Sequence, residues 1–118
     1  MIRGAAWLYS LLQRPIYITE NGTCDNEDTF RCRYLYDHLK VISEADLPVE
    51  RYYHWCFCDN FEWIEGESAR FGLVHVDYET QKRTVKKSGT FFAAMIKAGG
   101  VTPELYEEYV KEQTYKID

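Results

Sequence analysis

The sequence has 118 residues, of which 46% are hydrophobic and 16% aromatic, and its formal net charge is −5 at pH 7. This apolar content can build a packed core and excludes a disordered chain. The negative charge, without a cluster of lysine and arginine, argues against nucleic-acid and membrane partners, because anionic surfaces bind clustered cations. The apolar run within residues 4–12 is too short to cross a bilayer and lacks a cleavage site, so we expect a cytoplasmic protein.

The first predicted elements are a helix and a strand. Residues 4–12 carry apolar positions at helical spacing, and Pro15 ends that helix. Residues 16–19 are β-branched and aromatic, which predicts a buried parallel strand. Asn21-Gly22 predicts a turn directly after this strand.

A second helix and a second strand follow. Asp28 stands where it would cap a helix whose apolar positions fall within residues 30–42, and residues 43–48 break that helix. The aromatic-rich residues 49–58 predict a strand that is buried on both faces and pairs in parallel with the first strand across the helical crossover. The expected fold class is therefore α/β.

The last third of the chain predicts a hairpin and two helices. Residues 71–76 and 84–86 can pair as antiparallel strands. A helix that starts at Ser88 ends at the glycine pair 99–100, because glycine readily adopts the left-handed conformation that closes a helix. The Thr-Pro pair at 102–103 is typical of a helix start and predicts a short final helix.

The four cysteines do not predict a metal site. Cys56 and Cys58 point to the same face of the predicted strand as His54, but neither C-x₂-C nor H-x₃-H spacing is present. Cys24 and Cys32 fall in a predicted loop and a predicted helix. We expect reduced, structural thiols and neither a metal nor a cofactor.

Glu20 is the candidate catalytic residue, because it stands at the carboxyl end of a predicted strand. In parallel α/β architectures, side chains at that end leave the core and converge on ligand. A glutamate that merely begins a surface turn fits the same spacing, and the residues alone leave both readings open.

A second candidate cluster follows the second predicted strand, where Glu62 and Trp63 stand together. Pyranose rings present C–H faces, which stack on indole rings, and hydroxyl groups, which donate hydrogen bonds to carboxylates. This pair therefore favours sugar binding. Trp55, in the middle of the predicted strand, fits a core tryptophan equally well.

The segment at 18–22, Ile-Thr-Glu-Asn-Gly, resembles the nucleophile motif of glycoside hydrolase family 1, which comprises retaining β-glucosidases, β-galactosidases and their relatives. The resemblance extends from about residue 5 to about residue 98 and covers only the C-terminal part of the family's domain. Four further motifs match in the same order: Arg31 with Tyr34-Leu35 and His38-Leu39; Trp55 with Asp59-Asn60-Phe61-Glu62-Trp63; Arg70-Phe71-Gly72-Leu73 with Val76-Asp77-Tyr78; and Lys87-Ser88.

The resemblance implies the C-terminal portion of a (β/α)8 TIM barrel, namely its last two to three β/α units, because a complete barrel needs about 250 residues. We treat residues 1–118 as a single partial domain, in which 99–118 form a C-terminal extension with a short helix. The resemblance also assigns roles. Glu20 is the nucleophile, and Trp55, Glu62, Trp63 and Phe71 bind a β-glycoside.

The chain also departs from the family pattern. The family's acid/base carboxylate comes from an Asn-Glu-Pro motif, which this sequence lacks, and the upstream Gln, His and Asn sugar ligands are missing with it. Arg51 replaces a common glycine, and Cys56 replaces a common serine. Without the acid, the nucleophile loses a proton transfer that contributes typically 10²–10⁴-fold. We expect the chain to be inactive alone.

Three readings of function follow. The chain is the C-terminal part of a retaining β-glycosidase, a non-catalytic module that completes a barrel with a partner chain, or a self-standing domain that associates with itself. A 6-phospho-β-glycosidase is an alternative within the first reading. The acidic residues Asp59, Glu65 and Glu67 near Glu62, with Arg70 as the nearby cation, favour an unphosphorylated substrate.

Overall fold

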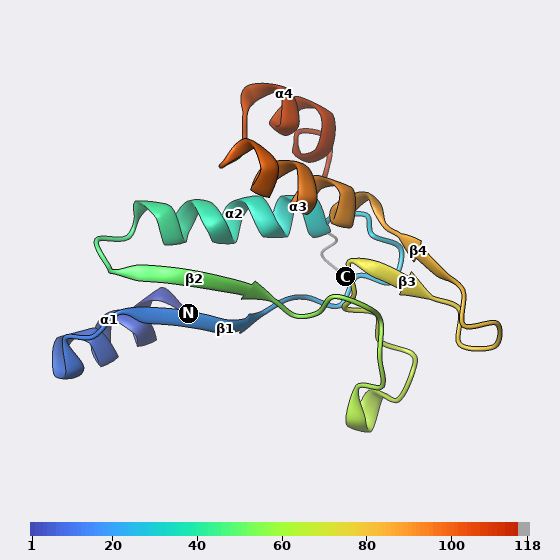
Figure 1. Cartoon of the computed structure of the whole chain (residues 1–118), viewed down its shortest axis with the longest axis horizontal. Coiled ribbons are helices and arrows are strands. Elements are labelled where there is room, and N and C mark those ends of the chain that lie inside the picture. Colours follow the sequence, from blue (N-terminus) through green and yellow to red (C-terminus); the bar gives the residue numbers. More distant parts are fainter. Residues whose placement is uncertain (116–118) are drawn as a thin grey trace.

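The computed structural model describes residues 1–115. A two-stranded parallel sheet and a short antiparallel hairpin lie beneath helices (Figure 1). The elements, in chain order, are α1 (Ile2–Leu12), β1 (Ile16–Asn21), α2 (Arg31–Glu44), β2 (Val49–His54), the 3-10 turn η1 (Trp63–Glu65), β3 (Val74–Val76), β4 (Arg83–Val85), α3 (Lys87–Ala98), α4 (Pro103–Leu105) and the π-helical turn η2 (Tyr106–Val110).

The parallel sheet confirms the predicted strand–helix–strand unit. β1 pairs in parallel with β2, with Ile16 opposite Val49 and Asn21 opposite His54, and α2 is the crossover between them. The prediction that the second strand is buried on both faces was wrong, because no residue of β2 is buried, and Ile18 is the one buried residue of β1. α2 and α3 lie together beside β2, whereas α1, next to β1, has no buried residue (Figure 1).

The core lies between the helices rather than around the sheet. Cys32 and Leu35 of α2 pack with Phe91 of α3, with Leu73 from the loop before β3, and with Val110 of η2. Cys32, Leu35, Phe91 and Val110 are completely inaccessible to solvent. The C-terminal segment therefore contributes directly to the core.

A clasp of hydrogen bonds holds the C-terminal segment on α2. The guanidinium Nε of Arg33 donates to the carbonyl of Gln113 at 3.2 Å, and the Gln113 side chain accepts from the Arg33 amide at 3.1 Å. The hydroxyl of Tyr115 donates to Asp37 at 2.9 Å. These contacts connect positions almost 80 residues apart in the sequence.

The prediction that Asp28 caps the second helix was wrong. Asp25 accepts instead from the amides of Phe30 and Arg31, at 2.8 and 3.0 Å, at the start of α2. Asp28 accepts from the amide and the hydroxyl of Ser88, at 2.8 and 2.6 Å, and pairs with the Arg31 guanidinium. It therefore caps α3, which begins about 60 residues later in the sequence.

The carboxyl ends of both strands differ from the prediction. β1 continues through Asn21, and the next turn comes at residues 26–27 rather than at Asn21-Gly22. β2 ends at His54 rather than at residue 58. A cis peptide joins Trp55 to Cys56, and the following residues pair with the 71–74 segment, so they no longer extend the sheet.

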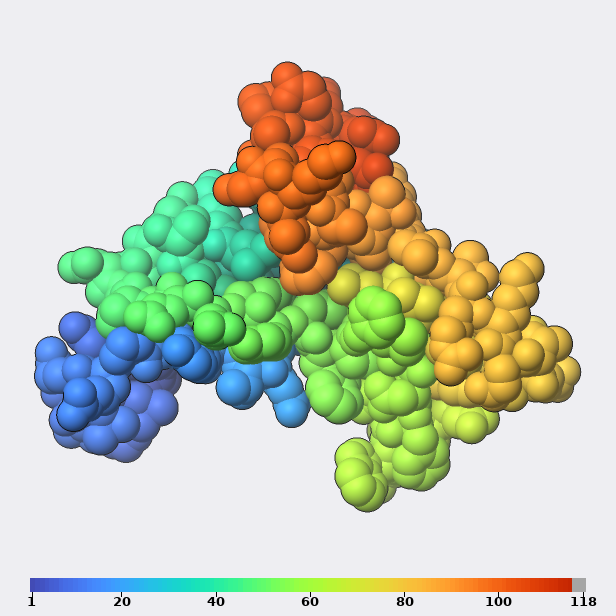
Figure 2. All heavy atoms as spheres, viewed as in Figure 1, coloured from blue at the N-terminus to red at the C-terminus, as the bar shows by residue number. Residues whose placement is uncertain are grey.

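The helix predicted at the amino terminus is confirmed as α1, but none of its residues is buried. Trp7 and Leu11 are 63% and 62% exposed. In Figure 2, α1 forms a separate lobe beside the sheet. The radius of gyration, 15.4 Å, exceeds the roughly 13.5 Å of a compact domain of this length. No helix within residues 1–115 is long and apolar enough to cross a membrane.

The predicted hairpin and final helices are confirmed. β3 pairs antiparallel with β4 in the register Val74 to Val85; β3 is shorter than predicted, and β4 has the predicted length but begins one residue earlier. Gly99 closes α3 in the left-handed conformation, with φ of 75°. The Thr102 hydroxyl accepts from the Leu105 amide at 3.2 Å and caps α4, which continues directly into η2.

Candidate active site

Glu20 is the second-last residue of β1, and its side chain is exposed. Within residues 1–115 the Glu20 side chain makes no hydrogen bond or ion pair. Its carboxylate is therefore accessible to a ligand. The backbone that follows it is fixed from β2 and α2. Asn21 accepts from the Tyr52 hydroxyl at 2.9 Å and from the Trp55 amide at 3.0 Å, and the Gly22 carbonyl accepts from Tyr34 at 2.9 Å.

Trp55 and Glu62 meet directly. The indole Nε1 of Trp55 donates to Oε1 of Glu62 at 3.0 Å, and both side chains are half-buried. This bond holds one carboxylate oxygen and leaves the other available as an acceptor. Because Trp55 follows β2 and its amide binds Asn21, the pair lies at the same end of the sheet as Glu20.

Trp63 and Phe71 are placed differently from this pair. Trp63 is 84% exposed and meets the ring of Phe61 edge-on, with the centroids 6.5 Å apart. Phe71 is half-buried, and its carbonyl accepts from the Cys56 amide at 3.2 Å. Within residues 1–115, no hydrogen bond or ring contact joins the Trp63 side chain to that of Trp55 or Glu62.

Asp59 anchors the loop that carries Glu62, a role that the sequence did not reveal. Its fully buried carboxylate accepts from Lys86 at 2.9 Å, from Arg70 at 3.1 Å and from the Gly72 amide at 2.9 Å. The imidazole of His75 lies 3.5 Å away. Burial alone would raise the pKa of Asp59, but the bonds from Lys86, Gly72 and Arg70 outweigh it and lower the pKa.

This cluster changes the charge expected around the site. The sequence had placed Asp59 among the free negative charges, with Arg70 as the nearby cation. The structure adds Lys86 as a second cation and commits both cations to Asp59. An aspartate flanked by later basic residues is too common a pattern to have predicted this cluster.

The four cysteines are free thiols. Burial raises the pKa of Cys32 to about 12 and that of Cys56 to about 11, so both stay protonated. The Cys56 thiol donates to the Cys58 carbonyl at 3.0 Å. Among residues 1–115, no group of three histidine, cysteine, aspartate or glutamate side chains could hold a metal ion.

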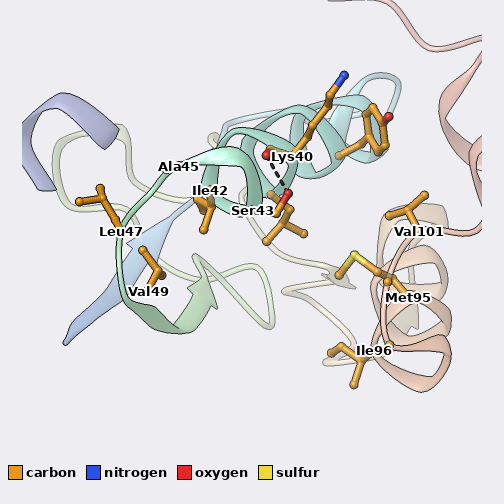
Figure 3. Close-up of a pocket in the computed structure, with 13 residues that line it drawn as sticks. Lys40, Ile42, Ser43, Ala45, Leu47, Val49, Met95, Ile96 and Val101 are labelled. Carbon is orange, nitrogen blue, oxygen red and sulfur yellow. Dashed lines mark hydrogen bonds between the residues drawn. The ribbon is translucent and has the colours of Figure 1, made fainter. Parts of the chain in front are cut away.

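A hollow of about 640 Å³ lies away from this site. It lies between α2 and α3 and reaches Val49, at the amino end of β2, whereas Glu20 stands at the carboxyl end of β1 (Figure 3). Figure 3 shows its lining as aliphatic side chains with Lys40 at the rim, where the Ser43 hydroxyl donates to the Lys40 carbonyl at 2.8 Å. Glu20, Trp55 and Glu62 are absent from this lining.

The carboxyl ends of the two parallel strands therefore carry an accessible glutamate and a tryptophan–glutamate pair, at the end of the sheet where α/β folds bind their ligands. The profile of glycosyl hydrolase family 1 matches residues 3–101. The chain belongs to this family.

Three relatives define the extent of the match. The chain is 46% identical over 100 residues to a β-glucosidase from Agrobacterium sp., covering 75% of this chain and 22% of that protein. It is 38% identical over 101 residues to a β-galactosidase from Pyrococcus woesei, covering 82% of this chain and 20% of that protein. The structure of a hyperthermophilic β-glucosidase from Pyrococcus furiosus superposes with a TM-score of 0.83 and 37% identity, covering 88% of this chain and 23% of that one. The chain thus spans about a fifth of the length of the relatives that it matches.

Proposed function

We propose that this chain is the C-terminal part of a retaining β-glycosidase that hydrolyses terminal, non-reducing β-D-glucosyl or β-D-galactosyl residues. The observation that carries the proposal is the position of Glu20, accessible at the carboxyl end of β1 and next to the strand end that bears the Trp55–Glu62 pair. The relatives named as β-glucosidase and β-galactosidase support both sugars.

In the proposed reaction, the Glu20 carboxylate attacks the anomeric carbon and forms a covalent glycosyl ester as the bond to the leaving oxygen breaks. A second carboxylic acid, about 5–5.5 Å from the nucleophile, donates its proton to that oxygen. The resulting carboxylate then takes a proton from water, which attacks the same carbon and releases the sugar and Glu20.

The sugar is held by the groups around Glu20. Glu62 accepts hydrogen bonds from the sugar hydroxyls far from the reacting carbon. The hydrogen bond from Trp55 fixes the orientation of the Glu62 carboxylate. Trp55 offers an indole face below the ring, while Trp63 and Phe71 complete the aromatic wall when the rest of the barrel is present.

The acid/base carboxylate comes from outside this sequence, which contains no Asn-Glu-Pro. We place the chain at the last two to three β/α units of the barrel, and without the acid we expect it to be inactive alone. We also place it in the cytoplasm. The isolated chain should hydrolyse an aryl β-glucoside no faster than background.

A hybrid tests the proposal. The N-terminal portion of the Agrobacterium β-glucosidase, up to its match with this chain, is joined to residues 1–118. We expect the hybrid to hydrolyse an aryl β-glucoside. A 2-fluoro glycoside should label the hybrid covalently and add the mass of one sugar at Glu20. Glu20→Gln should abolish both, whereas Glu27→Gln is the matched control. A hybrid that keeps its rate with Glu20→Gln would remove Glu20 as the nucleophile.

A further inference from the structure

Asn21 is the one asparagine of this sequence that is followed by glycine, whereas Asn26 and Asn60 precede a glutamate and a phenylalanine. Asparagine is a thermolabile residue, because its carboxamide can react with the backbone nitrogen of the next residue. Glycine in that next position has no side chain to hinder the reaction. The most reactive asparagine of the chain therefore lies directly after Glu20.

The reaction at such a pair is deamidation. The Gly22 nitrogen attacks Cγ of Asn21, and a new C–N bond closes a five-membered succinimide ring. The side-chain nitrogen leaves as ammonia and takes the proton that the backbone nitrogen gives up. Water then opens the ring at either carbonyl and leaves aspartate or isoaspartate, so that one water is consumed for each ammonia released. Isoaspartate lengthens the backbone by one carbon atom.

The fold restrains both reacting groups. The Tyr52 hydroxyl donates to Oδ1 of Asn21 at 2.9 Å and holds the carboxamide. The Asn21 carbonyl accepts from the Trp55 amide at 3.0 Å, and the Gly22 carbonyl accepts from the Tyr34 hydroxyl at 2.9 Å. Ring closure has to turn the carboxamide toward the Gly22 nitrogen, which breaks the bond from Tyr52 and disturbs the two backbone bonds.

We infer that Asn21 is a site of spontaneous deamidation beside Glu20, and that the hydrogen bond from Tyr52 sets the slow rate of this reaction in the folded chain. Aspartate at this position adds a negative charge next to Glu20, and like charges repel. Isoaspartate in addition shifts the end of β1, where Asn21 lies opposite His54. The effect of both products on hydrolysis rests on the proposed function, whereas the modification itself does not.

The experiment incubates the chain at mildly alkaline pH and follows each asparagine by peptide mass spectrometry. Asn21 should deamidate, faster in urea than in the folded chain, while Asn26 and Asn60 should not. Tyr52→Phe removes the hydroxyl and keeps the ring, and it should speed the reaction about two- to tenfold, the rate equivalent of one neutral hydrogen bond. Tyr53→Phe is the matched control, because that hydroxyl bonds Arg51 instead, and it should leave the rate unchanged.

A further variant separates local release of Asn21 from general unfolding. Val110→Ala weakens the core between the helices and touches none of the bonds around Asn21, so it calibrates how far a lower urea midpoint alone speeds deamidation. Three results would overturn the inference: no deamidation of Asn21 in urea, equal rates for Tyr52→Phe and the wild type, or an acceleration by Tyr52→Phe that its urea midpoint fully explains.

The hybrid enzyme tests the consequence for Glu20. Its hydrolysis of an aryl β-glucoside should fall in proportion to the deamidated fraction. A hybrid that keeps its rate after deamidation would overturn the effect on Glu20. A hybrid that is inactive before any deamidation would count against the proposed function and not against the modification site, which mass spectrometry establishes without activity.

Discussion

Gly22 lies so close to Trp55 that a Cβ on the glycine would stand 1.8 Å from the Trp55 carbonyl oxygen. The two residues come just after the carboxyl ends of β1 and β2. Their backbones therefore pack at the point where the segment after Glu20 meets the segment that leads to Glu62.

Gly22→Ala should destabilise the chain by about 1–3 kcal/mol or more, because the methyl group collides with backbone, which cannot rotate away. The midpoint of urea unfolding measures the change. Gly4→Ala is the matched control, since a methyl group on Gly4 would have no neighbouring atom within 4 Å. Equal midpoints for Gly22→Ala and the wild type would contradict the close contact.

Asp59→Asn should cost about 3–5 kcal/mol of stability, because it leaves the buried Lys86 and the half-buried Arg70 without their counter-charge. Glu79→Gln, which changes an exposed carboxylate nearby, should change stability little. Chemical denaturation at pH 7 compares the two. Because the folded pKa of Asp59 is lowered, its contribution is complete above the unfolded pKa of 3.8 and is lost as the pH falls through the folded value.

His54 should make the fold sensitive to mild acid. Both ring nitrogens are buried without a partner in the described chain, and burial lowers the pKa from 6.5 to about 4. The unfolded chain therefore takes up a proton below pH 6.5 that the folded chain refuses, and stability falls between pH 6.5 and 4. The loss should reach about 2 kcal/mol at pH 5.

The test compares urea midpoints at pH 7 and pH 5. His54→Phe should remove this part of the acid loss, whereas His38→Gln, a histidine whose ring bonds the Tyr34 carbonyl, should retain it. An unchanged pH dependence in His54→Phe would show that other groups carry the effect.

The exposed face of α1 should drive self-association of the isolated chain at micromolar concentration, because exposed apolar surfaces of this kind bind one another. Sedimentation should show oligomers or aggregates. Replacing Trp7 and Leu11 with Gln should reduce them without lowering the unfolding midpoint, since neither side chain is buried. A compact wild-type monomer with a cooperative thermal transition would show that the face is not adhesive.

An unphosphorylated glycoside should be preferred by the hybrid enzyme over its 6-phosphate. Arg70 and Lys86 are both committed to Asp59, so neither is free to bind a phosphate. A phosphate about 4 Å from the Glu62 carboxylate would be repelled by about 4 kcal/mol at an effective dielectric of 20. We expect kcat/KM for the aryl β-glucoside to exceed that for its 6-phosphate by about 10²–10³-fold. A higher value for the phosphate would refute this.

The sequence predicted the helices whose ends have local causes. Helical spacing, Pro15, Gly99 and the Thr-Pro pair at 102–103 act within a few residues, and the corresponding helix ends were confirmed. The errors came from partners that are distant in the chain. Asp25 and Asp28 have the same local chemistry, and only the approach of Ser88 decides which helix Asp28 caps.

The candidate site shows the same division. The placement of Glu20 at a strand end follows from the 16–22 segment alone, and it is confirmed. Gly22 was interpreted as a turn former, whereas its small size serves the contact with Trp55. Lys86 could not be assigned to Asp59, because a pairing across 27 residues leaves no periodic signal.

The hydrogen bonds around Arg33 show that the folded unit extends beyond the last residue that the family profile matches. The profile match stops at residue 101, yet Val110, beyond it, is among the most deeply buried side chains. A protein cut at residue 101 would expose the faces of Cys32, Leu35 and Phe91 that Val110 and its neighbours cover. Any engineered exchange of this segment between family members therefore has to carry residues 102–115 along with the helices they seal.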